Sequence, residues 1–577
     1  MKILTLHVDY IKFRPLKKAL KSIPEITSTE KKEQEAKEAL VVFTAIEHND
    51  SIVESVKELV KNIREIASQV KAENIVLYPY AHLSNNLAAP QIAMEILDKS
   101  EKELKKFFRV LKAPFGYYKE FELKVKGHPL SELSREIRIG AIETKDQAKI
   151  KEIEKEKDYN PKSLLRALGK SILDRSKLKD YDHRILGQDM DLFSFSDVSP
   201  GSVFWHPNGF IIYNELISFM RGIWKAFGYK EISTPQIINN NLWKISGHWE
   251  HYKENMFLTE YEGKHAAIKP MNCPPAMLFY RLEPRSYKEL PLRLAEFGVV
   301  HRKELSGVLA GLFRVVRISM DDAHIFCTRE QIEPEIENLF KIVKLVYKDT
   351  FNFDYSVELS TRPEKFLGSK EEWDFAEMAL ESALKKSKVK YKIKKGEGAF
   401  YGPKIDVHIK DSLEREWQVA TIQLDSQMPQ RFELKYIDKD NTEKTPLVIH
   451  RAIFGSLERF IGILLEHTKG RLPTWLAPIQ VRVLSFTNRN ESYAKKVVKL
   501  LEEGIPHLRI DFDFRSIPVP SKVRDAEIMK IPYIIVIGDK EEEQETLAVR
   551  IKGSKKIKTL RLKEFVESLY NEISKRI

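Results

Sequence analysis

The sequence is poor in cysteine and has no long apolar run. Its 577 residues include only Cys273 and Cys327, too few for a disulfide framework, so we expect a reducing compartment. No stretch approaches the roughly 18 apolar residues of a membrane helix. The opening segment MKILTLHVDY alternates like a β-strand and lacks the basic-then-apolar layout of a signal peptide. We therefore expect a cytoplasmic protein that does not associate with membranes.

The familiar glycine-rich nucleotide loops are also missing. The chain has no G-x-x-x-x-G-K-[ST] motif, and GEGAFYG at residues 396–402 misses the G-x-G-x-x-G spacing by one residue. A bound ATP would therefore need arginines, whose planar and permanently charged guanidinium groups bind phosphate bidentately. The excess of 96 Lys and Arg over 84 Asp and Glu gives a net charge of +12. That charge fits a polyanionic partner, but it fits a lysine-rich proteome equally well.

The chain is too long for a single core, and its composition divides it into an α/β multidomain protein. Residues 1–142 predict a compact α/β domain, in which a helix near residues 49–70 has Asn49 or Asp50 as its N-cap. Residues 143–195 are rich in charge and predict a linker with short helices. Residues 196–476 form the largest domain, where YKEISTPQI predicts a strand that ends at Pro235. Residues 477–577 alternate strand and helix as a small α/β domain.

Candidate phosphate-binding arginines lie in two segments. EFGVVHRKELSGVLAGLFRVVR places Arg302 at the end of a strand, Glu304 two residues later and Arg314 after a glycine-containing loop. GSLERFIGILLEH places Arg459 on an amphipathic helix. Two strands joined by a loop could direct both loop arginines into one cleft. For an isolated arginine, an ordinary salt bridge is the more common role.

Three candidate metal ligands are scattered along the chain. A thiolate and two imidazoles suit zinc with a fourth position left open, as in catalytic sites. Cys273 in KPMNCPPAM, His324 in MDDAHIF and His450 in VIHRAIF offer this set. Their wide separation makes the spacing a weak signal, and a buried structural role is the alternative for each.

Taken together and in order, the segments from about Asp182 to the C-terminus resemble a class II aminoacyl-tRNA synthetase of the threonyl type. The resemblance rests on DHRILG, FWHPNGFIIYNEL, YKEISTPQI, KPMNCPPAM, LAEFGVVHRKELSG, DDAHIF, GAFYGPKIDV, WQVATIQLD and IHRAIFGSLERFIGILLEH. No HIGH or KMSKS segment is present, which excludes a class I synthetase. The resemblance implies an antiparallel-sheet catalytic core and a homodimer that joins L-threonine to tRNA-Thr at the expense of ATP, through a threonyl-adenylate.

The resemblance also implies roles for the candidate residues. GYKEISTP corresponds to motif 1, which builds the dimer interface. In motif 2, Arg302 would hold the ATP α-phosphate, Glu304 would contact the adenine amino group and Arg314 would reach the γ-phosphate. In motif 3, Arg459 would also hold the γ-phosphate, with Mg²⁺ neutralising the polyphosphate. These arginines would stabilise the charge that develops on phosphorus.

The amino-acid pocket follows from the same resemblance. Cys273, His324 and His450 would bind one Zn²⁺ per subunit, and the substrate amino and hydroxyl groups would complete its shell. Asp322 would accept a hydrogen bond from the threonine hydroxyl. The remaining pocket residues would be Tyr401, Gln418, Thr421 and Gln423. A metal that requires a hydroxyl ligand rejects valine, which an apolar pocket does poorly.

The nucleotide site departs from the family pattern at three positions. Ile318 stands where the family has an aromatic residue that stacks on adenine. Arg317 and Met320 stand where glycine and glutamine are usual. Adenine would then lie between Arg459 and an aliphatic side chain.

Serine is smaller than threonine and has the same hydroxyl group, so such an enzyme needs an editing site. Residues 1–180 lack the His-x-x-x-His and cysteine motifs of the bacterial editing domain. YPYAHLSNN and APFGYYKEFELKVKGHPLSELSRE instead resemble the archaeal editing domain, which shares the fold of D-aminoacyl-tRNA deacylases. The implied editing residues are Lys119, Tyr118, His82 and Glu132. Without the resemblance, PFGYYKEF would simply predict a turn and a strand.

The C-terminal block resembles the anticodon-binding domain of histidyl-, prolyl- and threonyl-type enzymes. SKVRDAEIMKIPYIIVIGDKE and LAVR support this comparison, and the implied tRNA-contacting residues are Lys522, Arg524, Glu541 and Arg550. Arginine and carboxylate groups can recognise base edges in an unstacked loop. Ser516 stands where the family usually has asparagine.

Two other functions are known alternatives for a chain with these class II motifs. A class II relative that only binds tRNA or regulates another enzyme would usually lose motif arginines, whereas Arg302, Arg314 and Arg459 are all present. A prolyl- or seryl-specific enzyme is the other alternative. The Cys273, His324 and His450 set opposes the prolyl reading, and the C-terminal domain opposes the seryl one.

Overall fold

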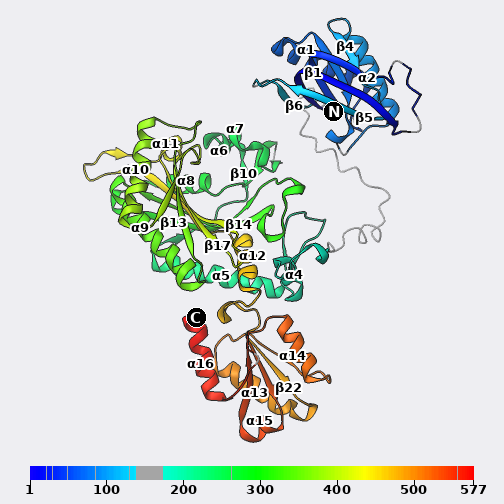
Figure 1. The fold of residues 1–577 in the computed structure, drawn as a ribbon. Helices are drawn as coiled ribbons and strands as arrows, with labels where there is room; N and C mark the ends of the chain where they lie inside the picture. The colour runs from blue at the N-terminus through cyan, green and yellow to red at the C-terminus, as the bar shows by residue number, and fades with distance from the viewer. Residues whose placement is uncertain are drawn as a thin grey trace. The chain divides into compact units, whose positions relative to one another are not determined.

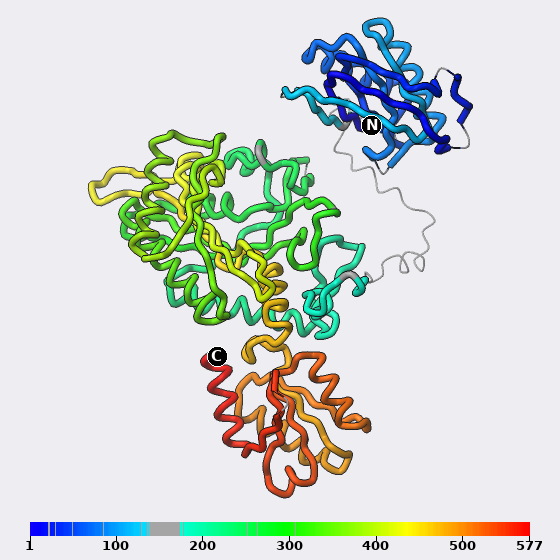
Figure 2. Tube along the Cα trace, in the orientation of Figure 1, coloured from blue at the N-terminus to red at the C-terminus, as the bar shows by residue number. Residues whose placement is uncertain are grey.

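The computed structural model describes residues 1–137 and 173–576, apart from residues 21, 22, 29, 49, 85, 129, 262 and 555. The chain divides into two compact units, residues 1–155 and 156–577. Figure 1 labels many of the helices and strands of both units, and Figure 2 traces the chain through them. Within the described residues, none of the helices combines the length and apolar character needed to span a bilayer.

The N-terminal unit is a six-stranded mixed sheet with two long helices. The strand order is β4-β3-β2-β1-β5, and β6 pairs with the first part of β1. The elements are β1 (Lys2–Lys18), β2 (Gln34–Ala45), α1 (Ile52–Val70), β3 (Asn74–Pro79), α2 (Pro90–Leu104), β4 (Arg109–Lys112), β5 (Tyr117–Val125) and β6 (Glu132–Glu136).

Alternation along the strands gives this sheet two apolar faces. One face buries Leu40, Val42 and Ile75 against α1 and α2. The other face buries Val41 and Phe43 in a second, separate cluster. Because side chains alternate across a strand, one continuous apolar run can supply both clusters.

The predicted helix in this unit is confirmed, but its N-cap is not Asp50. The helix α1 begins at Ile52 with Ser51 in the N-cap position. The Asp50 carboxylate instead accepts hydrogen bonds from the Met1 amino group at 2.9 Å and the Glu47 amide at 2.7 Å. The Met1 amino group and the Glu47 amide therefore occupy the carboxylate that was predicted to cap the helix. The other proposed cap, Asn49, lies outside the described residues.

The second unit is built on an eight-stranded sheet in the order β16-β15-β17-β18-β21-β14-β13-β9. The pairings from β15 through β13 are antiparallel, and only the outer strands β16 and β9 pair in parallel. The strands are β9 (Lys230–Glu231), β13 (Leu292–His301), β14 (Arg317–Cys327), β15 (Tyr355–Ser360), β16 (Tyr391–Lys394), β17 (Lys404–Lys410), β18 (Glu416–Asp425) and β21 (Leu447–Ser456).

Helices and a small second sheet surround this central sheet. The helices are α4 (His183–Asp189), α5 (Pro207–Ala226), α6 (Asn240–Ile245), α7 (His248–His251), α8 (Cys273–Arg281), α9 (Ile332–Val343), α10 (Lys370–Lys386), α11 (Gln427–Arg431) and α12 (Leu457–Thr468). The small sheet comprises β10 (Ile237–Asn239), β11 (Leu258–Tyr261) and β12 (Lys264–Ile268). Two-stranded pairs are formed by β7 (Phe193–Ser194) with β8 (Phe204–Trp205) and by β19 (Tyr436–Ile437) with β20 (Glu443–Lys444).

Two sequence-based boundaries shift in this unit. The strand predicted to end at Pro235 is only β9, two residues long, because Thr234 turns away to bind the Glu296 carboxylate. The end of the predicted 143–195 linker is folded: Leu186, Met190 and Phe193 are buried in the main core. The apolar side chains of α4 and β7 thus make this segment part of the second unit.

The last part of the chain has its own sheet and core. Parallel strands β23, β22 and β24 are followed by antiparallel β25 and β26. The elements are β22 (Val481–Ser485), α13 (Glu491–Gly504), β23 (Ile510–Asp513), α14 (Val519–Ile528), β24 (Tyr533–Ile537), α15 (Asp539–Gln544), β25 (Thr546–Ile551), β26 (Ile557–Arg561) and α16 (Leu562–Lys575). The alternating strands and helices agree with the predicted α/β domain.

Candidate functional site

The candidate site is assembled by cross-strand pairing in the central sheet. His324 on β14 lies opposite His450 on β21, and His450 lies opposite Gln423 on β18. Two residues further along, Asp322, Ala452 and Thr421 form the next row. Because alternate residues of a strand share one face, both rows point their side chains to the same side of the sheet. The antiparallel register therefore gathers residues that are up to 130 positions apart.

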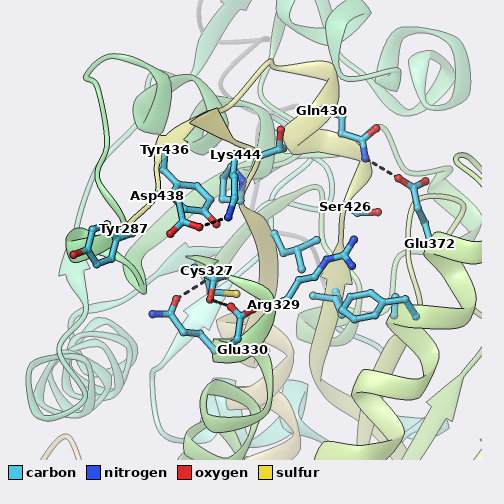
Figure 3. A pocket seen from close by; sticks show the side chains of 18 of the residues that line it. Tyr287, Cys327, Arg329, Glu330, Glu372, Ser426, Gln430, Tyr436, Asp438 and Lys444 are labelled. Carbon is cyan, nitrogen blue, oxygen red and sulfur yellow. Dashed lines mark hydrogen bonds and ion pairs between the residues drawn. The ribbon is translucent and has the colours of Figure 1, made fainter. Parts of the chain in front are cut away.

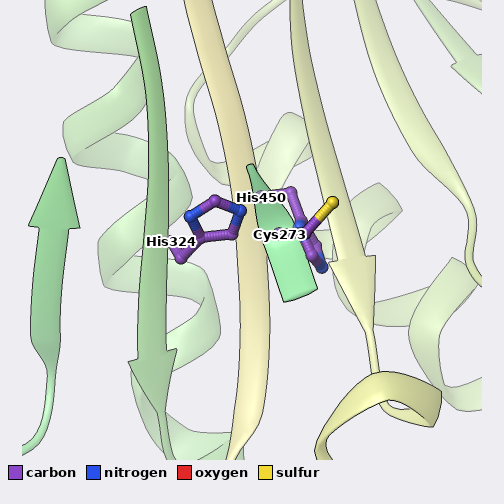
Figure 4. A group of neighbouring side chains, drawn as sticks. All are labelled: Cys273, His324 and His450. Carbon is purple, nitrogen blue, oxygen red and sulfur yellow. The ribbon is translucent and has the colours of Figure 1, made fainter. Parts of the chain in front are cut away.

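Cys273 joins this face from the first residue of α8. The thiol, His324 and His450 offer ligand atoms that all lie within 4.8 Å of one another (Figure 4). Pro274 and Pro275 occupy the first turn of α8. Backbone amides in a first turn have no partner within the helix, so proline loses no hydrogen bond there, and its ring fixes the backbone. One sulfur and two nitrogens leave one position of a tetrahedral zinc shell open. The donor set therefore fits zinc.

The two histidines differ in their surroundings. Burial keeps the pKa of His324 well below its ordinary value, so the ring is neutral and can donate a lone pair to a metal. Burial also opposes protonation of His450, but hydrogen bonds with Asp425 and Cys273 raise its pKa to about 10. The Nε2 atom of His450 lies 2.9 Å from Asp425 Oδ2. Nδ1 is then the nitrogen available to a metal, which would bind with release of a proton.

The cluster opens into a cavity of about 490 Å³. All four remaining predicted pocket residues line it, together with Asp322, Arg302 and Arg459; the four are Tyr401, Gln418, Thr421 and Gln423. Gln418 and Thr421 both donate to Asp406, at 2.6 and 3.0 Å. The structure therefore brings the proposed metal ligands, the amino-acid pocket and two of the motif arginines into one cavity.

Asp322 is held by Asn272, a residue that the sequence analysis did not single out. The Asn272 amide donates to Asp322 Oδ2 at 2.6 Å. A Cβ atom at Gly298 would lie 2.2 Å from the Asn272 side chain, so the glycine makes room for this contact. Burial raises the pKa of Asp322, whereas the bond from Asn272 lowers it. Asn272 stands inside the quoted KPMNCPPAM segment, which is the signal that could have revealed it.

Two of the four residues predicted to bind ATP line the nucleotide side of the cavity. Arg302 and Arg459 line it, whereas Arg314 and Glu304 are absent from its lining and form an ion pair at 2.8 Å. Glu304 was predicted to contact adenine; its carboxylate instead accepts from the Arg314 guanidinium. Burial lowers the pKa of Arg459, and the nearby Arg314 and Arg302 charges lower it further. Such a concentration of positive charge favours a polyphosphate ligand.

The aliphatic surface predicted beside adenine is present. Ile318 is 8% exposed, packs with Val300 and Val315, and also lines the cavity. Met320 lines the same wall. Arg459 reaches the cavity from the first turn of α12, where its Nε donates to Phe313 O at 2.9 Å.

The N-terminal unit brings together some of its predicted editing residues. Lys119 Nζ donates to the carbonyls of Pro114 and Tyr117 at 2.8 and 3.0 Å and lies 5.1 Å from the centroid of the Tyr78 ring. Burial lowers the pKa of Lys119 to about 8. Tyr80 connects Tyr78 to His82 through ring contacts of 6.3 and 5.4 Å.

The other two editing candidates, Tyr118 and Glu132, lie away from the Lys119 ammonium group. Tyr118 follows β-strand alternation to the face opposite Lys119 and is 63% exposed. Glu132 pairs with Leu6 of β1, whereas Lys119 pairs with Pro15. Nine residues of extended strand separate these points, or about 30 Å. A single copy of this unit therefore does not place Glu132 or Tyr118 beside the Lys119 ammonium.

The predicted anticodon residues differ in exposure. Arg524 is exposed, and Glu541 caps its own helix by accepting from the Gly538 amide at 3.0 Å. Arg550 is partly exposed and lies 3.4 Å from Glu527. Lys522 is 1% exposed and donates to the Ser485 carbonyl at 2.9 Å. Lys522 was predicted to contact tRNA, but its ammonium group is buried inside the domain and hydrogen-bonded there.

Comparison with known proteins places each part of the chain. Residues 1–137 match the model of the archaea-specific editing domain of threonyl-tRNA synthetase. Residues 257–468 match the class II tRNA synthetase core domain for G, H, P, S and T, and residues 480–572 match an anticodon-binding domain. The chain is 48% identical over 431 residues to a threonine–tRNA ligase of Clostridium tetani, covering 73% of this chain and 67% of that protein. The chain belongs to the threonyl-tRNA synthetase family.

Other relatives agree with this assignment. A threonine–tRNA ligase of Caldanaerobacter subterraneus is 50% identical over 427 residues, which cover 72% of this chain and 66% of that protein. The chain thus spans about two thirds of the length of these curated relatives.

Two solved structures are also similar. The RNA-binding domain of threonyl-tRNA synthetase from Cryptosporidium parvum has a TM-score of 0.65 and 41% identity, covering 68% of this chain and 98% of that one. The protein designated threonyl-tRNA synthetase ThrRS-1 of Aeropyrum pernix has a TM-score of 0.61 and 32% identity, covering 69% of this chain and 97% of that one.

The second unit also has another cavity, of about 580 Å³, at the carboxyl end of β14 (Figure 3). It is lined by Cys327, Arg329 and Tyr436, among others. Burial raises the pKa of Cys327 far above its ordinary value, so the thiol stays protonated and unreactive. None of the predicted catalytic residues lines this cavity.

Proposed function

We propose that the chain ligates L-threonine to tRNA-Thr in two steps. The threonine carboxylate attacks the α-phosphorus of ATP and releases pyrophosphate, which leaves threonyl-adenylate. The 3′-hydroxyl of the terminal adenosine then attacks the activated carbonyl carbon and releases AMP. The observation that carries this proposal is the shared cavity, in which Cys273, His324 and His450 face the same space as Arg302 and Arg459.

ATP binding is assigned to the arginines. Arg302 extends from the end of β13 and would hold the α-phosphate, where charge develops during attack. Arg459 would hold the γ-phosphate and cover one face of adenine, with Ile318 on the other. Arg314 would leave Glu304 to reach the γ-phosphate, which frees the Glu304 carboxylate for the adenine amino group. Mg²⁺ would accompany the ATP.

Threonine selection is assigned to the other end of the cavity. Cys273, His324 and His450 would hold Zn²⁺, which supplies a Lewis acid able to bind an amino and a hydroxyl group. Asp322, fixed by Asn272, would accept a hydrogen bond from the substrate hydroxyl. Valine lacks that hydroxyl and would leave the Asp322 oxygen that Asn272 does not contact without a donor, which is costly in a buried pocket.

Editing of seryl-tRNA-Thr is assigned to the N-terminal unit. The partly buried Lys119 ammonium is the best-supported group, because the carbonyls of Pro114 and Tyr117 fix its position. Together with main-chain donors it would orient the attacking water, assisted by the terminal ribose 2′-hydroxyl.

The remaining assignments concern domains and partners. We assign residues 1–142 to editing, 196–476 with the preceding α4 segment to catalysis, and 477–577 to anticodon binding. Arg524 is the strongest candidate for an anticodon contact because it is exposed. The enzyme would act as a cytoplasmic homodimer through motif 1 and the outer face of α5, where Phe210 is 49% exposed.

Aminoacylation with two amino acids tests the proposal. The purified chain should charge tRNA-Thr with threonine, should carry one zinc ion per chain, and should not accumulate seryl-tRNA. Cys273→Ala should lose both the metal and the threonylation activity. Wild-type protein that contains no zinc when freshly prepared, or that fails to charge tRNA-Thr, would contradict the proposal.

A further inference from the structure

A buried histidine links three segments around the nucleotide side of the cavity. His183 is the first residue of α4 and is 1% exposed. Its Nε2 accepts a hydrogen bond from the Leu312 backbone amide at 3.0 Å. Its Nδ1 lies 2.7 Å from Glu466 Oε1 on α12. Because an amide can only donate, Nε2 must be the acceptor, and the ring proton must lie on Nδ1 and point to Glu466.

The Glu466 carboxylate is fully used in this arrangement. Its Oε1 also accepts from the His183 backbone amide at 3.0 Å, and its Oε2 accepts from the Arg415 guanidinium. Asp182, His183 and Glu466 are close enough to form a metal site. However, both ring nitrogens of His183 already have hydrogen-bond partners. We therefore interpret the cluster as a hydrogen-bonded network and not as a second metal centre.

The segment held by His183 contains the ATP-binding groups. Leu312 and Phe313 immediately precede Arg314. The Phe313 carbonyl accepts from Arg459 Nε at 2.9 Å. One short turn, Gly311–Phe313, therefore directly precedes Arg314 and contacts the Arg459 side chain.

Packing holds the same turn closely. The Phe313 ring lies 4.2 Å from the His183 ring and 4.5 Å from the Trp417 ring, centroid to centroid. A Cβ atom at Gly462 of α12 would lie 3.0 Å from the Phe313 ring. A Cβ atom at Gly311, where φ is +56°, would lie 2.3 Å from His183 Nε2. Both glycines thus permit a close approach of the turn to α4 and α12.

We propose that His183 is a positioning residue for ATP: it uses Glu466 as an anchor and fixes the Gly311–Phe313 turn so that Arg459 and Arg314 can bind the polyphosphate. The inference rests on the proposed synthetase function and extends it to a residue that does not line the substrate cavity. Loss of the His183 acceptor would leave the buried Leu312 amide without a partner and release the turn. The Cys273, His324 and His450 pocket would be unaffected.

Two substitutions separate this role from simple packing. The amide of His183→Gln can occupy the place of Nε2 and accept from Leu312, whereas the amide of His183→Asn can occupy the place of Nδ1 and reach only Glu466. His183→Asn should raise the KM for ATP about tenfold, the usual size for an unpaired buried amide. His183→Gln should stay within about threefold of wild type, and neither variant should change the KM for threonine.

Threonine-dependent pyrophosphate exchange measures both constants on the full-length chain, and thermal unfolding identifies any variant that fails to fold. His206→Gln serves as the control, because His206 also uses both ring nitrogens, on Asp191 and Ser194, and neither partner belongs to the Gly311–Phe313 turn. Amide hydrogen exchange at Leu312 gives a readout that is independent of turnover and should quicken in His183→Asn only. If His183→Asn keeps the wild-type KM for ATP, or if both variants lose ATP and threonine binding equally, the inference is wrong. A wild-type chain without exchange activity would instead contradict the proposed function.

Discussion

Substitution of Asp425 by asparagine gives a strong test of the metal site because it changes one atom beside a ligand. Asp425 Oδ1 accepts from the Gln427 and Met428 amides at 2.7 and 3.0 Å, and Oδ2 lies 2.9 Å from His450 Nε2. In Asp425→Asn, the side-chain oxygen should keep the position of Oδ1, because there it accepts two backbone hydrogen bonds, whereas the Oδ2 position offers only the single contact with His450. The new NH₂ group would then face His450 Nε2.

Two donors cannot share this contact, so His450 would have to move its proton to Nδ1. That nitrogen is the one left for the metal, and the proton would block its lone pair. Loss of such an outer-shell partner usually weakens metal binding about 10- to 100-fold, or about 1.4 to 2.8 kcal/mol. Zinc affinity should fall by this amount in competition with a chromophoric chelator.

The control is Asp406→Asn, which removes a carboxylate in contact with Gln418 and Thr421 but with none of the three proposed ligands. Its zinc affinity should equal that of wild type. If Asp425→Asn binds zinc within about twofold of wild type and unfolds at the same temperature, the proposed orientation of His450 is wrong.

Three further predictions concern other parts of the molecule. Arg302→Ala should abolish threonine-dependent pyrophosphate exchange, because no other group is assigned to the α-phosphate; a near-wild-type rate would count against the motif 2 assignment. Gly298→Ala should raise the KM for threonine, since its Cβ would lie 2.2 Å from the Asn272 side chain that holds Asp322; an unchanged KM would show that Asn272 is dispensable. Lys119→Met should let seryl-tRNA-Thr accumulate while threonylation persists. Because burial lowers the pKa of Lys119 to about 8, its ammonium form is lost as the pH rises through about 8, and wild-type deacylation should fall over that range; a flat pH profile would remove the cation from the mechanism.

Most secondary structure could be predicted from local patterns. Periodicity located α1 and the alternating elements of the C-terminal domain, because their apolar spacing reflects one buried face. The errors occurred where a distant partner intervened. Asp50 could not be assigned from its neighbours because its partner is the Met1 amino group, and the strand before Pro235 ended early because Thr234 binds Glu296.

The same limit applied to the sites. Lys522 has the charge of a tRNA-binding residue, and only the packing of α14 on β22 shows that its ammonium group is buried on Ser485. Glu132 and Lys119 lie 13 residues apart in sequence, yet β1 pairs with them at opposite ends. His183 and Asn272 stood inside quoted motifs without an assigned role, because a hydrogen-bond partner cannot be inferred from spacing.

The sequence by itself determined the family, the order of the domains and the identity of the zinc and phosphate candidates, because ordered motifs and residue types are written along the chain. Tertiary structure decided which of these residues meet. The register of β14, β21 and β18 brings His324, His450 and Gln423 into one row, and α8 adds Cys273. The physical reason is that a cross-strand pair is set by the fit of whole strands, through their hydrogen bonds and buried faces, and no short segment contains that information.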